Sequence, residues 1–362
     1  MCAKYTGNEV NRAGEALRST SPLSDEEFKQ VFDVLSYWRF SHDEPLEVAF
    51  QILQEVVSSR DRSAFFAKRL KRHVSIYNKL CRFQKMNLKN MQDVGGCRAV
   101  VTSEKKLRQS VRDLKKYSQF KFSDGPKFRY KDYLRNPKAD GYRSYHMVGK
   151  FYGSENRSRS IEIQIRTRIQ HYWATALEIV DLFTNQALKS NQGDMYWTAY
   201  FVEISKQFGA IDGIHLVDSL SREERLTKYS DLLRKDDALR ESCILVRKQA
   251  NELGVVRKLE AFASSLNIVG GRLSETDSSN YALLKIDSST STLFSMIFTK
   301  EQAKEAELEY KEAEKEAAQG TDLAVALVSA SAVGGIQEAY PNFFADSTEF
   351  LELADMISSV RF

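Results

Sequence analysis

The chain has 362 residues, of which 42% are hydrophobic and 28% are charged, and its formal net charge is +4. This composition is typical of a globular protein long enough for two domains, and it argues against a disordered or membrane-embedded chain. The N-terminal residues lack the apolar core of a signal peptide, and the four cysteines form no C-x-x-C pair that would indicate a zinc site or a disulfide framework. We therefore expect a cytoplasmic protein that does not bind membranes.

Positive charge is concentrated in the middle of the chain. From Arg60 to Tyr172 there are 29 lysines and arginines against 9 aspartates and glutamates, whereas the remainder holds 24 basic and 40 acidic residues. Such an uneven distribution of charge attracts polyanions to the basic segment. Nucleotides, RNA and an acidic partner domain all fit this pattern, and a solvated basic surface is the alternative without a ligand.

The first half of the chain alternates irregularly between helical and strand patterns. Residues 24–59 read as helices that begin at the N-cap Ser24, and Ser103 caps a further helix. The expected strands are 95–102, 141–151 and 160–167, separated by a polar loop at 121–139, and a helix begins near Thr167. This irregular order predicts an α+β fold, with a mixed β-sheet core flanked by helices.

The second half is mostly helical over residues 185–270 and then changes character. Beyond Gly270 come two strand patterns, a charged helix, an apolar strand and a final helical stretch. This order predicts a smaller C-terminal α+β domain with an acidic composition. The expected division is an N-terminal helical region at 1–59, the core at 60–190, a helical region at 191–269 and the acidic domain at 270–362.

Two strand patterns place polar residues on one face. In SIEIQIRT, three isoleucines alternate with Glu162, Gln164 and Arg166, and in GYRSYHMV the residues Tyr142, Ser144 and His146 share a face. Two neighbouring strands of this kind would present a carboxylate, an amide, a phenol and an imidazole to one concavity. An ordinary amphipathic edge strand would show the same alternation.

Two carboxylates stand out in this basic surrounding. Glu162 lies on the alternating strand, and Asp93 directly precedes the glycine-led strand VGGCRAVV. Mg²⁺ that carries phosphates is commonly held by one or two carboxylates together with the phosphate oxygens, while lysines and arginines stabilise the phosphate charge. The sequence has neither a P-loop nor a dinucleotide-binding motif, so we expect side chains to bind any phosphates.

Four linked motifs resemble one known family. RLKRHVSIYNKL, DVGGCRAVV, FRYKDYLRNPKADGYRSYH and IEIQIRTRIQHYWATALE occur over Ala67–Glu178 in the order and at the spacing of RelA/SpoT-type alarmone synthetases. The resemblance covers roughly a third of the chain. It implies an ATP-dependent nucleotide pyrophosphokinase that uses Mg²⁺ and transfers pyrophosphate from ATP to the 3′-hydroxyl of GDP or GTP, making (p)ppGpp.

The same resemblance implies a role for each matching residue. Asp93 and Glu162 would hold the metal, with Glu162 alternatively accepting the proton of the attacking hydroxyl, and Gln164 would position the acceptor. The donor nucleotide would be bound by Arg69, Lys71, Ser75, Lys79 and Arg98. The acceptor would be bound by Arg129, Lys131, Lys138, Tyr142 and His146. His171, Trp173 and Glu178 would brace the site.

The sequence departs from the family pattern at three positions. Asp140 stands where the family usually has Asn, Tyr145 replaces a common Leu, and Ile179 replaces a common His, so the identity of the acceptor stays open. The pair His42-Asp43 resembles the signature of the family's hydrolase domain. With five histidines in the whole sequence, the ligands for that domain are missing, and we expect a synthetase-only chain in which His42 is a loop residue.

Two other functions compete with (p)ppGpp synthesis. Some small family members are toxins that pyrophosphorylate the 3′ end of tRNA, and the basic segment suits such a polyanion, with the acidic C-terminal domain as the restraining element. A non-catalytic RNA-binding or regulatory module is the second alternative, although pure binding has no need of paired metal carboxylates. The sequence leaves a homo-oligomer open.

Overall fold

The computed structural model describes residues 5–19, 22–123, 127–154, 157–187, 193–273, 280–287, 290, 292–317, 323–329 and 343–362. The chain divides into two compact units: unit 1 comprises Met1–Asn136 and Ser144–Thr167, and unit 2 comprises Pro137–Arg143 and Arg168–Phe362. None of the helices in the described ranges has the length and apolarity needed to cross a membrane. The four-part division expected from the sequence stays a prediction.

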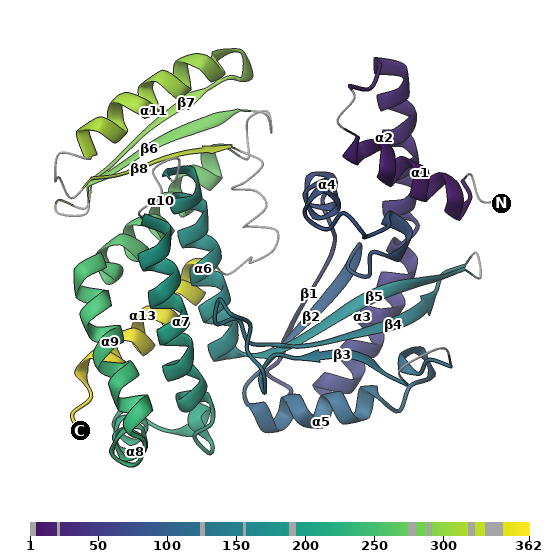
Figure 1. Ribbon diagram of the computed structural model, residues 1–362. Helices are drawn as coiled ribbons and strands as arrows, with labels where there is room; N and C mark the ends of the chain where they lie inside the picture. Colours follow the sequence, from purple (N-terminus) through teal and green to yellow (C-terminus); the bar gives the residue numbers. More distant parts are fainter. Residues whose placement is uncertain are drawn as a thin grey trace. The chain divides into compact units, whose positions relative to one another are not determined.

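Unit 1 is built on a mixed five-stranded sheet (Figure 1). Its helices are α1 (Gly7–Arg18), α2 (Asp25–Phe40), α3 (Asp43–Ser58), α4 (His73–Arg82) and α5 (Glu104–Leu114). Its strands are β1 (Phe65–Leu70), β2 (Gly95–Val101), β3 (Arg129–Asp132), β4 (Tyr145–Tyr152) and β5 (Ser158–Thr167). The sheet order is β1-β2-β5-β4-β3, in which only β2 and β5 run parallel. This arrangement confirms the predicted α+β core.

One face of this sheet is apolar because the strands alternate. Ile161, Ile163 and Ile165 of β5 are fully buried in a core to which α3 and α5 contribute. Ser24 and Ser103 cap α2 and α5 through their hydroxyls, as the sequence predicts. Because side chains alternate across a strand, burial of the isoleucines fixes the opposite face of β5 as the polar one.

A second core holds α4 in place. Ile76 and Leu80 of α4 are fully buried against α1, α2 and the segment that precedes β2. His42 is also buried, with Nδ1 2.8 Å from the carbonyl oxygen of Trp38. His42 lies, as the sequence predicts, in the short turn between α2 and α3, but it is packed rather than exposed there.

A buried carboxylate ties the entry of β1 to the end of β2. Asp61 accepts hydrogen bonds from the Thr102 amide (2.7 Å), from the hydroxyls of Thr102 and Ser63 (2.9 Å each) and from Lys106 Nζ (3.1 Å). Burial opposes ionisation of Asp61, but these hydrogen bonds outweigh it and hold the pKa of the carboxyl well below its usual range. Asp61 is thus a structural carboxylate that stays ionised in the folded protein.

We expect Asp61→Asn to lower the free energy of unfolding by about 1–3 kcal/mol at neutral pH, because charged hydrogen bonds to a buried group are lost. Since the pKa of Asp61 is lower in the folded state, its contribution is fully present above the unfolded pKa and is lost as pH falls toward the folded value. Urea unfolding should therefore show a difference between variant and wild type that shrinks in acid. The exposed Asp33→Asn serves as the control, and equal stability of both variants would contradict the prediction.

Unit 2 contains a second, smaller sheet packed on helices (Figure 1). Its helices are α6 (Arg168–Ala187), α7 (Gly193–Asp212), α8 (Arg222–Lys235), α9 (Asp237–Leu253), α10 (Val255–Leu273), α11 (Ala303–Ala317) and α13 (Phe343–Ser359). Its strands β6 (Tyr281–Asp287), β7 (Thr292–Phe298) and β8 (Leu323–Ser329) form an antiparallel sheet in the order β7-β6-β8. The central strand β6 buries Leu284 against the helical core and Leu283 against α11.

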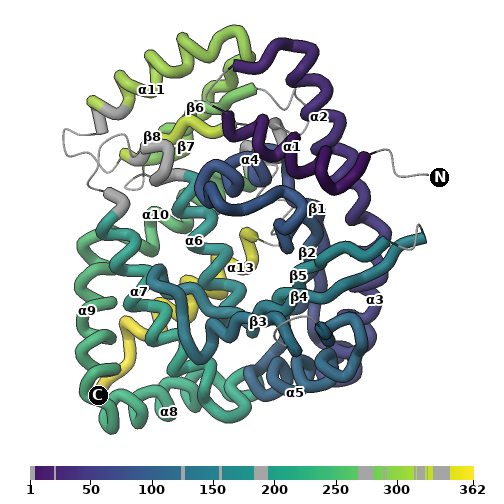
Figure 2. Tube along the Cα trace, turned by 45° about the vertical axis from the view of Figure 1, so that its right-hand side comes forward, coloured from purple at the N-terminus to yellow at the C-terminus, as the bar shows by residue number. Residues whose placement is uncertain are grey.

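Helix α13 completes the helical core of unit 2 and packs against α6 (Figure 2). His171 Nε2 of α6 lies 3.1 Å from Asp346 Oδ2 of α13, and both residues are buried. Arg247 Nε donates to the carbonyl oxygen of Ile357 at 2.9 Å. Residues far apart in the sequence therefore share one core.

Candidate functional site

Strand pairing gathers predicted site residues on the polar face of the unit 1 sheet. Directly paired residues lie on the same face of a sheet. One row across the sheet is Arg69, Gly96, Glu162, Val148 and Arg129, and the next row is Ala67, Arg98, Gln164, His146 and Lys131. The structure thus brings seven of the predicted residues together across five strands: Arg69, Arg98, Arg129, Lys131, His146, Glu162 and Gln164.

Glu162 lies at the centre of this face. Its Oε1 accepts a hydrogen bond from Gln164 Nε2 at 2.8 Å, and His146 Nδ1 lies 3.4 Å from the same oxygen. Burial opposes ionisation, but the hydrogen bond and charge of His146, the bond from Gln164 and the charge of Lys79 together lower the pKa of Glu162 to about 2. The carboxylate is therefore ionised throughout the physiological pH range.

Gln164 is oriented from both ends of its amide. Its nitrogen donates to Glu162, and its Oε1 accepts a hydrogen bond from Arg166 at 3.2 Å. Arg166 is only 2% exposed. The alternation of polar residues in this strand predicts that Arg166 lies on this face, and it predicts no role for it. The alternation along β5 is the one sequence signal that indicates a shared face for Glu162, Gln164 and Arg166.

Asp93 lies between two lysines rather than against Glu162. Lys71 Nζ is 3.1 Å from its Oδ2, and Lys79 Nζ is 2.7 Å from its Oδ1. Lys71 is itself fixed through its backbone, because its amide donates to the Val94 carbonyl at 2.7 Å and its own carbonyl accepts from Arg39 at 2.9 Å. Lys79 links the two carboxylates, since its charge also acts on Glu162.

This donor set fits a magnesium ion that carries phosphates. Among the described residues no group of three or more His, Cys, Asp or Glu could hold a metal by itself. Mg²⁺ in phosphate-transfer sites commonly takes only one or two carboxylates and completes its shell with water and phosphate oxygens. Asp93 and Glu162, both influenced by the single ammonium of Lys79, offer such hard oxygen ligands to a cation.

Two of the predicted donor residues, Arg69 and Arg98, lie beside an open place on the sheet. Ser75 and Lys79 are four residues apart on α4 and therefore share a face of that helix. Arg69 is exposed and Arg98 is buried, and they lie diagonally across Gly96. A Cβ built on Gly96 would meet nothing nearer than the Glu162 carbonyl oxygen at 3.5 Å. No side chain therefore fills the row between Arg69 and Glu162.

Two of the predicted acceptor residues belong to unit 2. Lys138 Nζ lies 4.5 Å from the centre of the Tyr142 ring, and this ring contacts Trp173 edge-on at 6.3 Å. The loop at 137–143 turns through Gly141, whose φ is +90°, and the Gly141 carbonyl accepts a hydrogen bond from Ser205 at 2.5 Å. The remaining acceptor residues, including Arg129 stacked at 4.2 Å on Phe122, belong to unit 1.

The expectation that Tyr142 lies on a strand beside His146 is wrong. Strand β4 begins at Tyr145, because the backbone before it is committed to local turn bonds. The Tyr142 amide donates to Asp140 Oδ1 at 2.9 Å, and its carbonyl accepts from the Lys138 amide at 3.2 Å. These groups are thus not available to a strand ladder.

The three departures from the family pattern have structural explanations. The Asp140 carboxylate closes the turn at Tyr142, a task that the amide oxygen of an asparagine could equally perform. Tyr145 and Ile179 are buried core residues. Of the bracing residues, His171 and Trp173 are buried, and Glu178 is exposed. None of these observations identifies the acceptor.

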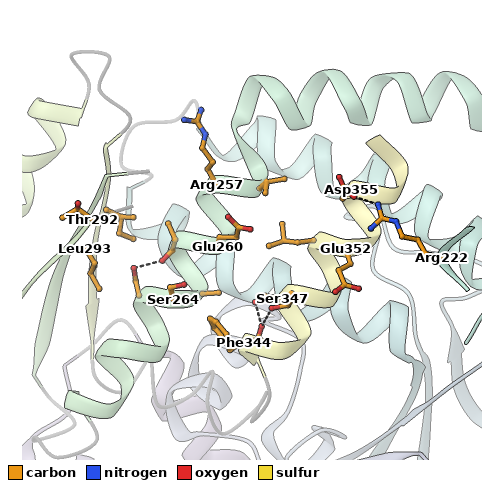
Figure 3. A pocket seen from close by; sticks show the side chains of 17 residues that line it. Arg222, Arg257, Glu260, Ser264, Thr292, Leu293, Phe344, Ser347, Glu352 and Asp355 are labelled. Atoms are coloured by element: carbon orange, nitrogen blue, oxygen red, sulfur yellow. Dashed lines mark hydrogen bonds and ion pairs between the residues drawn. The ribbon is translucent and has the colours of Figure 1, made fainter. Parts of the chain in front are cut away.

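A separate cavity of about 890 Å³ lies within unit 2, between α10, α13 and the β6–β7 edge (Figure 3). Its charges are mixed: Arg222 forms an ion pair with Asp355, and Arg257 shares the cavity with Glu260 and Glu352. None of the residues predicted to bind nucleotide or metal lines it.

Comparisons with known proteins agree with the motifs. Residues 68–179 match the RelA_SpoT family, described as a region found in RelA / SpoT proteins. The chain is 31% identical over 105 residues to "Probable GTP diphosphokinase RSH3, chloroplastic" of Arabidopsis thaliana, a match that covers 28% of this chain and 14% of that protein. It is 27% identical over 152 residues to "GTP pyrophosphokinase YwaC" of Bacillus subtilis, covering 39% of this chain and 70% of the relative.

Solved structures of small alarmone synthetases also resemble the chain. Small alarmone synthetase 1 from Bacillus subtilis, bound to its product pppGpp, is 22% identical with a TM-score of 0.41, covering 49% of this chain and 93% of the other. A GTP pyrophosphokinase family protein from Streptococcus pneumoniae is 22% identical with a TM-score of 0.40, covering 53% and 96%. The family match therefore coincides with the four motifs: residues 68–179 are similar to the region found in RelA / SpoT proteins.

Proposed function

We propose that this chain is an ATP-dependent pyrophosphokinase that transfers pyrophosphate from ATP to the 3′-hydroxyl of GDP or GTP, making (p)ppGpp. The family match and the curated relatives support this class of reaction. The observation that carries the proposal is the environment of Glu162, an ionised carboxylate among cations on the polar face of the sheet.

The chemistry requires little more than positioning and charge. The acceptor's 3′ oxygen forms a bond to the β-phosphorus of ATP and its proton is released to water, while the bond from that phosphorus to the oxygen bridging the α-phosphate breaks and AMP leaves. The lysines and arginines of the site stabilise phosphate charge that shifts in the transition state. Bound Mg²⁺, held by Asp93 and Glu162, would supply further positive charge to the same oxygens.

The low pKa distinguishes two roles for Glu162. A carboxylate with a pKa of about 2 is a weak proton acceptor at neutral pH. The same property makes it a good ligand for a hard cation, because it does not need to lose a proton first. Glu162 is therefore available as a metal ligand without first losing a proton.

The open place over Gly96 gives a test of donor binding. We expect Gly96→Val to fold with a Tm close to wild type, since a Cβ meets only ordinary contact there and valine favours strands. The added side chain fills the row between Arg69 and Glu162, so transfer should fall by roughly 10²-fold through displacement of the donor. Thermal unfolding, ATP binding and turnover measure the three effects.

The neighbouring glycine provides the matched control. A Cβ on Gly95 would lie 2.8 Å from Ile161 Cδ1, so Gly95→Val should lose stability through the core. A stable Gly96→Val protein with unchanged ATP affinity would contradict the assigned donor position.

Tyr142 tests acceptor binding. We expect Tyr142→Ala to weaken use of the acceptor by about 1–3 kcal/mol, the usual contribution of a stacked base, with little change in ATP binding. Tyr142→Phe keeps the ring and should keep most of the activity. Steady-state kinetics with varied acceptor measure this, and a Phe variant as inactive as Ala would show that the hydroxyl is needed.

One incubation separates the proposed function from its alternatives. Purified protein is given ATP labelled in the γ-phosphate together with GDP, GTP or bulk tRNA, and the labelled products are separated. Labelled guanosine tetra- or pentaphosphate is the expected result. Label on tRNA would establish the toxin-type reaction, which the excess of basic residues from Arg60 to Tyr172 favours. No transfer to any acceptor would leave a binding module.

A further inference from the structure

A basic pocket lies in unit 1, and none of its lining residues is among those assigned to the donor, the acceptor or the metal. Its volume is about 250 Å³, and it is lined by Lys89, Lys150, Arg157, Arg159 and the serines Ser158 and Ser160. No aspartate or glutamate is among its described lining residues. The cavity of Figure 3 differs in this respect, because carboxylates balance its arginines.

The fold places this pocket on the same sheet face as the row that contains Glu162. Lys150 of β4 and Ser160 of β5 are direct cross-strand partners. Ser160 precedes Glu162 by two residues, so both point from β5 to the same polar face. Lys89 comes from the short 3₁₀ turn before β2, and Gly7 lies at the first position of α1. Three separate segments thus direct cationic side chains into one hollow, next to the first residue of α1.

Three of the four cations of this pocket have no carboxylate partner among the residues that the structure describes. Within the part of the chain that the structure describes, Lys89, Lys150 and Arg157 form no ion pair with an aspartate or glutamate. Arg159 is held by Ser41 Oγ at 2.8 Å and stacks on Trp38 at 4.5 Å. Like charges brought together in a partly enclosed space repel one another unless an anion binds between them.

The Lys89 ammonium lies in a second unfavourable electrostatic environment, besides the neighbouring cations of the pocket. A Cβ on Gly7 would lie 2.9 Å from Lys89 Nζ, so this ammonium lies over the N-terminus of α1. Helix N-termini carry partial positive charge and favour anions. Glu9 in the first turn is engaged by the Thr6 amide and hydroxyl at 2.6 and 2.7 Å. The end of α1 is already capped by Thr6, so a bound phosphate would chiefly offset the charge of Lys89.

We propose that this pocket is a second anion site, which binds a phosphate group outside the catalytic row. Its size suits a diphosphate or triphosphate chain, and the two serine hydroxyls add hydrogen-bond donors. The phosphate can come from a free polyphosphate-bearing nucleotide or from the backbone of RNA, and the two sources share the chemistry that the pocket recognises.

Isothermal titration of inorganic tripolyphosphate into the full chain tests the site without turnover. The variant Lys89→Gln/Arg157→Gln removes two exposed cations of the pocket, and Lys105→Gln/Arg112→Gln removes two exposed cations of α5 as a control with equal charge. We expect the pocket variant to lose one binding equivalent, or to bind it at least about tenfold more weakly, and the control to retain it.

A third variant separates geometry from net charge. Gly7→Ala keeps every charge but places a methyl group where the Lys89 ammonium lies, so it should also weaken the same equivalent. The titrations are then repeated with a short single-stranded RNA. Whichever of the two ligands, tripolyphosphate or RNA, resembles the physiological one should bind the wild type more tightly, and its binding should be weakened by the pocket variant. Unchanged binding in the pocket variant, or equal loss in the α5 control, would overturn the proposal.

Discussion

Glu162→Gln should reduce pyrophosphate transfer by roughly 10²–10³-fold or more while the protein remains folded. The substitution keeps the shape of the side chain but removes the charge that His146, Gln164 and Lys79 hold in place. Removing a depressed-pKa carboxylate also removes the attraction for a metal ion. Turnover with saturating ATP and acceptor measures the loss, and circular dichroism confirms the fold.

The matched control is Glu15→Gln, an exposed glutamate of α1 in the same unit. It should retain full activity. Because the pKa of Glu162 is about 2, the wild-type pH profile should show no loss from its protonation between neutral pH and the ordinary range of a glutamate. Near wild-type turnover in Glu162→Gln would remove the proposed metal site.

Asp93→Asn should have an effect of similar size, for a partly different reason. The change removes one of the two carboxylates proposed to bind the metal, and it also leaves Lys71 and Lys79 without the charge that positions them. We therefore expect turnover to fall by on the order of 10²-fold or more and the apparent affinity for ATP to change with it. Titration with Mg²⁺ at fixed ATP should show a higher metal requirement in the variant.

Asp113 offers a close control for this experiment. It also pairs with two cations, Arg60 and Lys116, but it lies on α5 and is assigned no role in the reaction. Asp113→Asn should leave turnover and the metal requirement unchanged. If both variants lose activity equally, disturbance of charge in unit 1 rather than loss of a metal ligand explains the result.

The parts of the site that depend on strand alternation could be predicted from the sequence. Three isoleucines at alternate positions of β5 determine which face is buried, and they thereby place Glu162 and Gln164 together on the other. The α+β class followed from the same periodicities. These features are local, because each depends on residues within one or two strands.

The parts that depend on distant contacts could not be predicted in this way. The turn that carries Tyr142 is closed by local bonds at Asp140 and is also held by Ser205, more than 60 residues later, and the sequence predicted a strand through it instead. The pairing of Asp93 with Lys71 and Lys79 depends on where α4 packs, which the buried Ile76 and Leu80 decide. The pocket around Lys89 likewise joins segments whose proximity no periodicity reveals.

The proposed restraining role of residues 270–362 needs a gentler test than deletion. Helix α13 buries apolar residues with α6, and Asp346 pairs with His171. A deletion of all residues after Asn267 would remove the proposed restraining region, but it would also expose the apolar core that α13 covers. Substitutions at exposed positions of unit 2 leave the core intact. Their effect on activity and on its salt dependence therefore reports on the restraining role alone.

The packing of α13 against α6 also sets an order of events on the ribosome. The last residue of the unit 1 sheet, Thr167, is made before α6, whereas α13 follows the end of α6 by about 150 residues. At roughly 5–20 residues per second, the part of α6 that packs on α13 waits on the order of 10–30 seconds for that partner, although α7 and α10, which also pack on α6, are made earlier. The nascent chain should therefore depend on chaperones during this interval, and rare codons between α6 and α13 should lower the yield of soluble protein.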